Sequence, residues 1–147
     1  MTLKTVTLAR PHPAIVGEMV PFLEELGMLV EQVTQISQLK HQITATTDAV
    51  VISLAVTSTI RASVERVLAE VMQLNPHVVL IFSSELPLSK KQKNLCYLLS
   101  KYFSKPCIAS YDNQCLEVRN GRCLYICAND LTDASRRSQL TQLIRNW

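Results

Sequence analysis

The chain has 147 residues, of which 48% are hydrophobic and 18% charged, and its formal net charge is +3. These values favour one globular domain, 1–147, over a disordered chain or a coiled coil, and the slight charge argues against a nucleic-acid partner held by phosphate neutralisation. Apolar runs fall well short of the roughly 20 residues that cross a membrane, and the N-terminus has no signal-peptide core. We therefore expect a cytoplasmic protein with no membrane contact.

Metal-ligating residues are scattered along the chain. Its five cysteines are Cys96, Cys107, Cys115, Cys123 and Cys127, and its three histidines are His12, His41 and His77. The cysteine count is odd, no C-x-x-C pair occurs, and no histidine is close to a cysteine in the sequence. A zinc site normally needs closely spaced ligand pairs. We expect reduced thiols, no metal site and no cofactor.

The first half of the chain alternates apolar strand patterns with helical patterns. Strands are predicted over 3–9, 28–34 and 49–56, with a helix from Pro13 and a short polar helix over 36–45. Pro13 suits the first helical position, because its missing N–H would be unpaired there, and Gly27 ends that helix. Pro21 inside it predicts a kink or a late helix start. The run "AVVISLAV" at 49–56 is typical of a central strand buried on both faces.

The second half continues the alternation. We predict a helix capped by Ser58, a strand over 77–84, a helix from Ser89 with Gln92 at capping-box spacing, a fifth strand over 107–111, and a last helix from Thr132 or Asp133. Asn120-Gly121 between two alternating runs predicts a β-hairpin over 115–127. In that hairpin Val118 faces Cys123 and Leu116 faces Tyr125, which places Cys115 and Cys123 on opposite faces and excludes a disulfide between them.

Strands that alternate with helices predict an α/β fold, a three-layer sandwich around a mostly parallel sheet. Open sheets of this kind bind ligands beyond the carboxyl ends of their strands. The residues expected there are Arg10, Pro11 and His12 after the first strand, Ser53 at the end of the third, and Ser83 with Ser84 at the end of the fourth.

Read in order, these segments resemble the receiver domains of bacterial response regulators, the signal-transduction modules of two-component systems. Receivers begin with a strand, an Asp-Asp pair, often His-Pro, and then a helix; "VTLARPHPAIVGEM" (6–19) has that layout, with His12 and Pro13 at the His-Pro positions. The place of the phosphorylated aspartate falls on Ser53, and that of the Ser or Thr that contacts the phosphoryl group falls on Ser83. The resemblance covers roughly 3–111. It implies the flavodoxin-like strand order 2-1-3-4-5. The hairpin predicted over 115–127, between the fifth strand and the final helix, is foreign to the receiver pattern and would extend or flank one edge of the sheet.

The departures from the receiver pattern are chemical. Arg10 and Pro11 stand where receivers hold Mg²⁺ with an acidic pair, and neither supplies the anionic oxygens that Mg²⁺ needs. Ser53 replaces the phosphoacceptor aspartate. Lys105-Pro106 precedes the predicted fifth strand, whereas receivers have their Lys-Pro after it, so we do not give Lys105 the family's role. The strand-end pocket is therefore predicted to be degenerate, as in a pseudo-receiver that is not phosphorylated on aspartate.

Two interpretations of Arg10 follow from this pattern. In one, Arg10 is a fixed positive charge that points into the pocket as a permanent stand-in for the metal ion. In the other, Arg10 is a surface residue that reaches a nearby carboxylate.

Three lysines, Lys90, Lys91 and Lys93, begin the fourth long helical pattern, where positive charge opposes the helix dipole. A solvated helix end is one interpretation; the other is a surface that binds a partner or an anion, for which such a local conflict is typical. By resemblance, 86–111 forms the face with which receivers meet their partners. The leading hypothesis is a non-catalytic, receiver-like regulatory module that acts through a protein partner, and a homodimer is left open.

The main alternative is a small enzyme or a nucleotide- or anion-binding domain that uses His12, Ser53 and Ser83. Imidazole is a common general base, but the three glycines form no phosphate-binding loop and no nucleophile elbow surrounds Ser53. A basic strip of Arg136, Arg137 and Arg145 raises nucleic-acid binding as a lesser alternative. A structural subunit of a larger assembly, the third, would expose a sizeable apolar patch.

Overall fold

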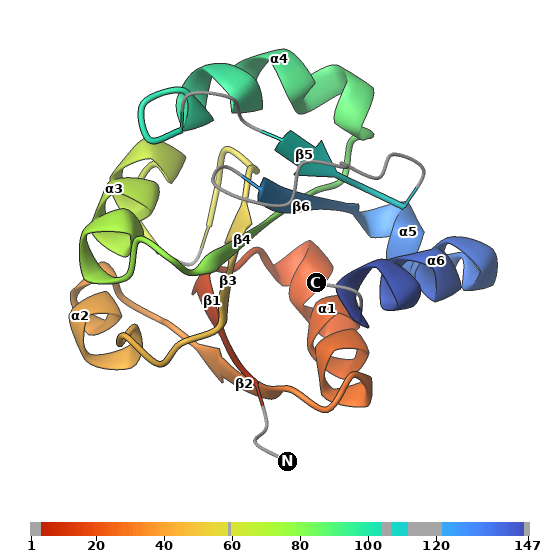
Figure 1. Cartoon of the computed structure of the whole chain (residues 1–147), viewed down its shortest axis with the longest axis horizontal. Helices are drawn as coiled ribbons and strands as arrows, with labels where there is room; N and C mark the ends of the chain where they lie inside the picture. Colours follow the sequence, from red (N-terminus) through yellow and green to blue (C-terminus); the bar gives the residue numbers. More distant parts are fainter. Residues whose placement is uncertain (1–3, 59, 104–106, 112–121, 146–147) are drawn as a thin grey trace.

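The computed structural model describes residues 4–58, 60–103, 107–111 and 122–145 (Figure 1). The strands are β1 (Thr5–Arg10), β2 (Leu29–Gln32), β3 (Ala49–Ser53), β4 (Val79–Ser84), β5 (Cys107–Ala109) and β6 (Arg122–Cys127). The helices are α1 (Pro13–Glu25), α2 (Leu39–Gln42) with a 3₁₀ turn η1 (Ile36–Gln38) before it, α3 (Val64–Leu74), α4 (Leu88–Leu99), α5 (Ala128–Thr132) and α6 (Ala134–Arg145). The predictions that concern Lys105, Cys115, Leu116, Val118 and the turn Asn120-Gly121 lie outside the described residues.

The strands form one parallel sheet in the order β2-β1-β3-β4-β6-β5. Helices α2, α3 and α4 cover one face, and α1, α5 and α6 cover the other (Figure 1). Each face has its own apolar core, and β3 contributes to both: Val50 and Ile52 pack toward α3, whereas Ala49 and Val51 pack toward α1. This two-sided burial explains the unbroken apolar run of β3. The predicted fold class, a three-layer receiver-like α/β sandwich, is confirmed.

The strand order at the far edge differs from the expected 2-1-3-4-5. The strand beside β4 is β6, and β5 lies beyond it at the edge of the sheet. Cys123 of β6 therefore has Leu80 of β4 on one side and Ile108 of β5 on the other. Val118, the predicted partner of Cys123, lies outside the described residues. The physical reason for the observed strand order is burial, because the side chains of residues 123–127 are all buried in the sheet, far more than an isolated hairpin would achieve.

Helices α1 and α3 begin after a residue whose side chain caps them, and several predicted helix starts are corrected by the structure. Helix α1 begins at Pro13 rather than late, and it continues through Pro21 to Glu25. Helix α3 begins after Ser63, whose hydroxyl accepts a 3.2 Å hydrogen bond from the Arg66 N–H. The predicted cap Ser58 instead donates a 2.6 Å hydrogen bond to the carbonyl of Pro11, so it joins two loops rather than starting a helix.

The two C-terminal helical segments also differ in detail from expectation. Helix α4 begins at Leu88, with Pro87 as its N-cap and no side-chain cap, so the predicted Ser89–Gln92 box does not form. The last predicted helix, from Thr132 or Asp133, corresponds to α6, which begins after Asp133; the Asp133 carboxylate accepts a 3.0 Å hydrogen bond from the Arg136 N–H. The short helix α5 before it was not predicted. In the described part of the chain, no helix is both long and apolar enough to span a membrane.

Candidate functional site

The carboxyl ends of β1, β3, β4 and β6 meet at one edge of the sheet. There Ser53 pairs with Ser83 across the β3–β4 ladder, and Ser83 pairs with Ile126 of β6. Arg10 ends β1 beside Ile52 of β3. The structure thus brings Arg10, Ser53 and Ser83 to neighbouring strand ends, as the parallel pattern predicts. We call these three residues with Pro11 and His12 the strand-end site.

A register shift directs the side chain of Arg10. Leu8 pairs with Val51 and Arg10 pairs with Ile52, so β1 has one extra residue between these two pairs. In a regular strand Arg10 would face the same side as Leu8, which packs toward α1. The extra residue instead gives Arg10 the side of Ile52, which packs toward α3. The apolar pattern of this strand in the sequence does not predict the extra residue.

The guanidinium group of Arg10 is buried and holds the loop between β3 and α3. Nη1 donates hydrogen bonds to the carbonyls of Ser53 at 2.6 Å and Ala55 at 2.7 Å. Nε donates to the carbonyl of Ala62 at 2.9 Å, and Nη2 to that of Val56 at 3.3 Å. Since the residue is only 3% exposed, the interpretation of Arg10 as a surface residue is wrong. Burial lowers the pKa of Arg10, an effect that the carboxylate of Glu65 partly offsets.

The donor set at this edge does not fit the Mg²⁺ ion that receiver-like sites use. Mg²⁺ needs several oxygen ligands in near-octahedral geometry, but here the carbonyl oxygens of Ser53 and Ala55 accept hydrogen bonds from a cation. The β1 residues at the acidic-pair positions, Arg10 and Pro11, offer no carboxylate. Within the described ranges, no three His, Cys, Asp or Glu residues are placed to hold a metal ion.

The two serines of the strand-end site are buried. Ser53 is fully buried, and its hydroxyl oxygen accepts a 3.2 Å hydrogen bond from the Ala55 N–H. Ser83 is 1% exposed, and its carbonyl accepts a 2.8 Å hydrogen bond from the Leu54 N–H. A phosphoryl donor therefore has no access to either hydroxyl while the loop after β3 stays in place.

His12 has a structural task at the start of α1. Its Nδ1 accepts a 3.2 Å hydrogen bond from the Ala14 N–H, and Pro13 follows as the first helical residue. This capping satisfies a helix N–H that would otherwise lack a partner. The alternative role of His12 as a general base gains no support from this geometry, because the cap occupies one of its two ring nitrogens.

Two buried polar residues near the strand ends escaped the sequence analysis. The Tyr125 hydroxyl donates a 2.5 Å hydrogen bond to the carbonyl of Leu86, and burial raises the pKa of Tyr125. Asp130, 1% exposed, accepts a 2.8 Å hydrogen bond from the Cys127 N–H, and its Oδ1 lies 3.6 Å from Nη1 of Arg136. Tyr125 thus holds the loop after β4, and Asp130 holds the start of α5, which follows β6 directly. For Asp130 the sequence offered one signal, an acidic residue three positions after the end of an apolar run, which is typical of a capping box.

The arginines of α6 are engaged within the domain. The Arg136 guanidinium, besides its Asp130 contact, lies 4.8 Å from the centre of the Tyr111 ring. Arg137 forms a 2.6 Å ion pair with Glu25 and lies 5.0 Å from the centre of the Phe22 ring. These contacts weaken the interpretation of α6 as a basic strip for nucleic acid.

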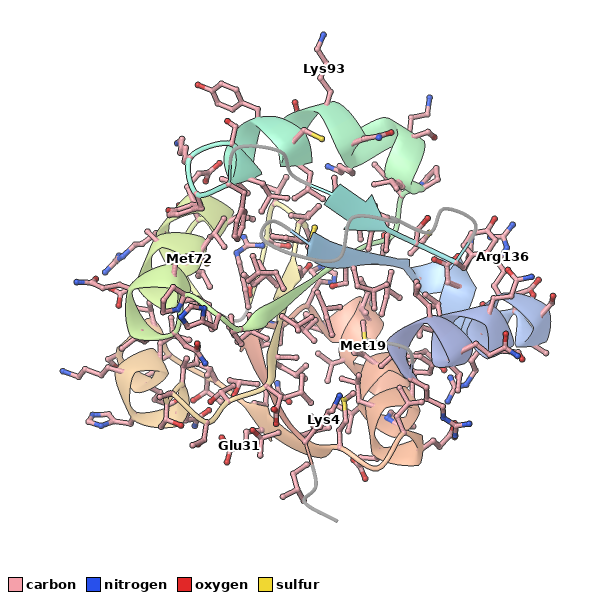
Figure 2. The ribbon with its side chains drawn as sticks, in the orientation of Figure 1. Lys4, Met19, Glu31, Met72, Lys93 and Arg136 are labelled. Atoms are coloured by element: carbon pink, nitrogen blue, oxygen red, sulfur yellow. The ribbon has the colours of Figure 1, made fainter. Side chains whose placement is uncertain are left out.

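The lysines of α4 divide into two sets. Lys90 and Lys93 are exposed, and Figure 2 shows Lys93 pointing away from the domain on the outer side of α4. Lys91 instead lines a groove between α4 and the start of α3, of about 320 Å³. We call this the α3–α4 groove; its lining residues are Leu54, Val64, Glu65, Lys91, Asn94, Leu95, Tyr97, Leu98 and Lys101. The sequence analysis did not single out Tyr97 or Lys101 as surface residues.

Of the comparisons with known proteins, the one with solved structures gives a match, and it shows the fold alone. No family model matches the sequence, and no curated protein matches it by sequence. Among solved structures, the chain is similar to a response regulator receiver domain protein from Clostridium thermocellum, with a TM-score of 0.52 and 14% sequence identity over 100% of both chains. This similarity reaches the full length of the chain, including the C-terminal segments beyond 111 that the sequence resemblance leaves out.

Proposed function

We propose that the protein is a receiver-like regulatory module that acts through a protein partner, without catalysis and without phosphorylation on aspartate. The observation that carries this proposal is the buried guanidinium of Arg10, which stands at the acidic-pair position and bonds the carbonyls of Ser53 and Ala55. The receiver-like fold supports a regulatory role by analogy.

A cation that is part of the chain cannot leave its site, whereas a metal ion can bind and dissociate. Arg10 donates to four carbonyls between Ser53 and Ala62, and Ser58 fastens the same loop to Pro11. Because guanidinium stays charged at any physiological pH, the loop has no signal-dependent partner to gain or lose. The module is therefore held in one conformation, and regulation depends on its partner.

The partner is expected at the face 86–111, which includes α4 and β5. Helix α4 has no acidic residue and no side-chain cap in its first turn, although Lys90 and Lys91 lie there. By contrast, α3 has the Ser63 cap and Glu65 in its first turn. A helix start that lacks the usual stabilising groups favours a binding role for its charges. A homodimer through this face would appear in sedimentation as a concentration-dependent mass.

The enzyme or anion-binding alternative has less support. Its three residues are His12, which caps α1, and Ser53 and Ser83, which are buried. A general base and a nucleophile need access to a substrate and to each other. No described residue of the strand-end site meets both requirements.

The test is a titration with beryllofluoride and Mg²⁺, followed by amide NMR of the whole chain. Because the pocket lacks metal ligands and a phosphoacceptor, we expect no change at residues 9–13, 53 and 83, while an intact receiver treated in the same way shows clear shifts. Shifts clustered at those residues would mean that the strand-end site still responds to a phosphoryl analogue, and the proposal would be abandoned.

A further inference from the structure

The α3–α4 groove combines an apolar floor with a basic wall. Leu95 and Leu98 of α4 are buried beneath it, and Leu54 closes one end from the loop after β3. Lys91 and Lys101 line the α4 side. A concave apolar surface with a few polar groups at its rim is the usual form of a binding site.

The basic wall carries no carboxylate of its own, and among the described residues Glu65 of α3 is the one acidic residue that lines the groove. Residues 88–101 contain four lysines, Lys90, Lys91, Lys93 and Lys101, and no Asp or Glu. Of the ion pairs formed between described residues, none includes one of these lysines. The positive potential over α4 is therefore left for a binding partner to neutralise.

An exposed aromatic side chain stands at the rim of the groove. Tyr97 is 74% exposed, and the ammonium group of Lys101 lies 5.9 Å from the centre of its ring. Exposed tyrosines beside basic groups are common energetic centres of protein interfaces. Tyr97 would bury its ring once a segment lies in the groove.

We propose that the α3–α4 groove binds an acidic segment of a partner protein, with one aliphatic or aromatic side chain as its anchor. The anchor lies on Leu95 and Leu98, and the carboxylates on either side of it pair with Lys91 and Lys101. This inference rests on the proposed function, because it names the chemistry of the partner.

The dimensions of the groove fit a short segment. Eight positions separate Lys91 from Leu99, the last residue of α4, which corresponds to roughly 12 Å of helix rise, and Lys101 lies in the turn just beyond. An extended peptide covers that helical distance with about four residues. A nucleic acid fits less well, because its evenly charged backbone offers no apolar anchor for the floor formed by Leu95 and Leu98.

The experiment measures binding of fluorescently labelled peptides to the whole chain by anisotropy. The probe is a short peptide of glutamates with a central leucine; the comparison probes replace that leucine by serine, or the glutamates by lysines. Amide NMR locates each binding site. The protein variants are the double variant K91A/K101A, its matched control Lys93→Ala on the outer side of α4, and Glu65→Gln.

We expect the glutamate–leucine peptide to shift amides of Leu54, Glu65, Lys91 and Lys101. Its affinity should fall about tenfold or more in K91A/K101A, because two charge pairs are lost, but only about twofold in Lys93→Ala, which alters the field from a distance. Glu65→Gln should tighten binding, since a like charge is removed. The serine and lysine peptides should bind far more weakly.

Several results would overturn the inference: unchanged affinity in K91A/K101A, shifts confined to another surface, equal binding of the serine peptide, or stronger binding of single-stranded DNA of equal charge. The K91A/K101A spectrum must first match that of the parent chain outside α4. If the peptides do not bind the groove and beryllofluoride causes no shifts, only this inference is contradicted and the proposed function is retained. If beryllofluoride causes shifts at the strand-end site, the proposed function is contradicted, regardless of the peptide results.

Discussion

The Nη1 atom of Arg10 lies 2.6 Å from the main-chain oxygen of Ser53, at the end of the neighbouring strand. This contact joins the ends of β1 and β3. The same nitrogen also reaches the carbonyl of Ala55 at 2.7 Å. A positive charge thus occupies the edge of the sheet permanently, and it also holds the loop that follows β3.

Replacement of Arg10 by lysine should destabilise the protein by about 2–4 kcal/mol, although the charge is retained. A lysine ammonium cannot reproduce the planar fork that reaches four carbonyls, and it would leave buried acceptors unsatisfied. Urea unfolding measures the free energy, and hydrogen exchange should show faster exchange over 54–62. Arg61→Ala, which removes an exposed arginine from the same loop, should change the stability by less than about 0.5 kcal/mol. Equal effects of the two substitutions would contradict the role given to Arg10.

Alanine at two glycines should have opposite effects on stability. Gly27 has φ +83°, a left-handed conformation that disfavours a side chain, so Gly27→Ala should cost about 1 kcal/mol. Gly17 is exposed inside α1, with open space where a Cβ would lie, so Gly17→Ala should stabilise the protein by about 0.5–1 kcal/mol. Thermal unfolding of both variants checks the signs. A stabilising Gly27→Ala would show that the end of α1 differs from the one described.

Tyr125 should make the stability fall at high pH. Burial raises the pKa of Tyr125, so between its unfolded value of about 10 and its folded value only the unfolded chain ionises. The stabilisation is complete below about pH 10 and is lost as the pH rises further, by up to about 1.4 kcal/mol per pH unit. Tyr125→Phe should cost about 1 kcal/mol at neutral pH, through loss of the bond to Leu86. The difference between the two proteins in urea unfolding should shrink above pH 10; a constant difference would rule out this linkage.

Asp130 should be important for the start of α5, which follows β6 directly. Asp130→Ala removes the buried carboxylate that accepts a hydrogen bond from the Cys127 N–H and lies beside Arg136. We expect the free energy of unfolding to fall by about 2–3 kcal/mol. Asp130→Asn keeps an acceptor and should cost less. Asp133→Ala, which removes an exposed cap from α6, should cost about 1 kcal/mol and is the matched comparison. Urea unfolding ranks the three variants, and a smaller effect at Asp130 than at Asp133 would refute the assignment.

Local patterns were sufficient for much of the fold and for part of the site. The periodicity of 49–56 and 77–84 predicted two strands buried on both faces, and Pro13 marked the start of α1. The positions of Arg10, Ser53 and Ser83 at neighbouring strand ends followed from the parallel arrangement. The place of Cys123 between Leu80 and Ile108 was not predicted, because the burial of a whole strand in the sheet depends on contacts that a local turn signal does not report.

The sequence by itself determined the alternation of strands and helices, the parallel three-layer fold and the presence of Arg10, Ser53 and Ser83 at the strand ends. These features depend on residue type and on spacing along the chain. Only the tertiary structure decided that β6 lies between β4 and β5, that the extra residue in β1 directs Arg10 toward Ala62, and that Lys91 and Lys101 border one groove while Lys93 points away. Each of these depends on contacts between residues far apart in sequence, which no local pattern encodes.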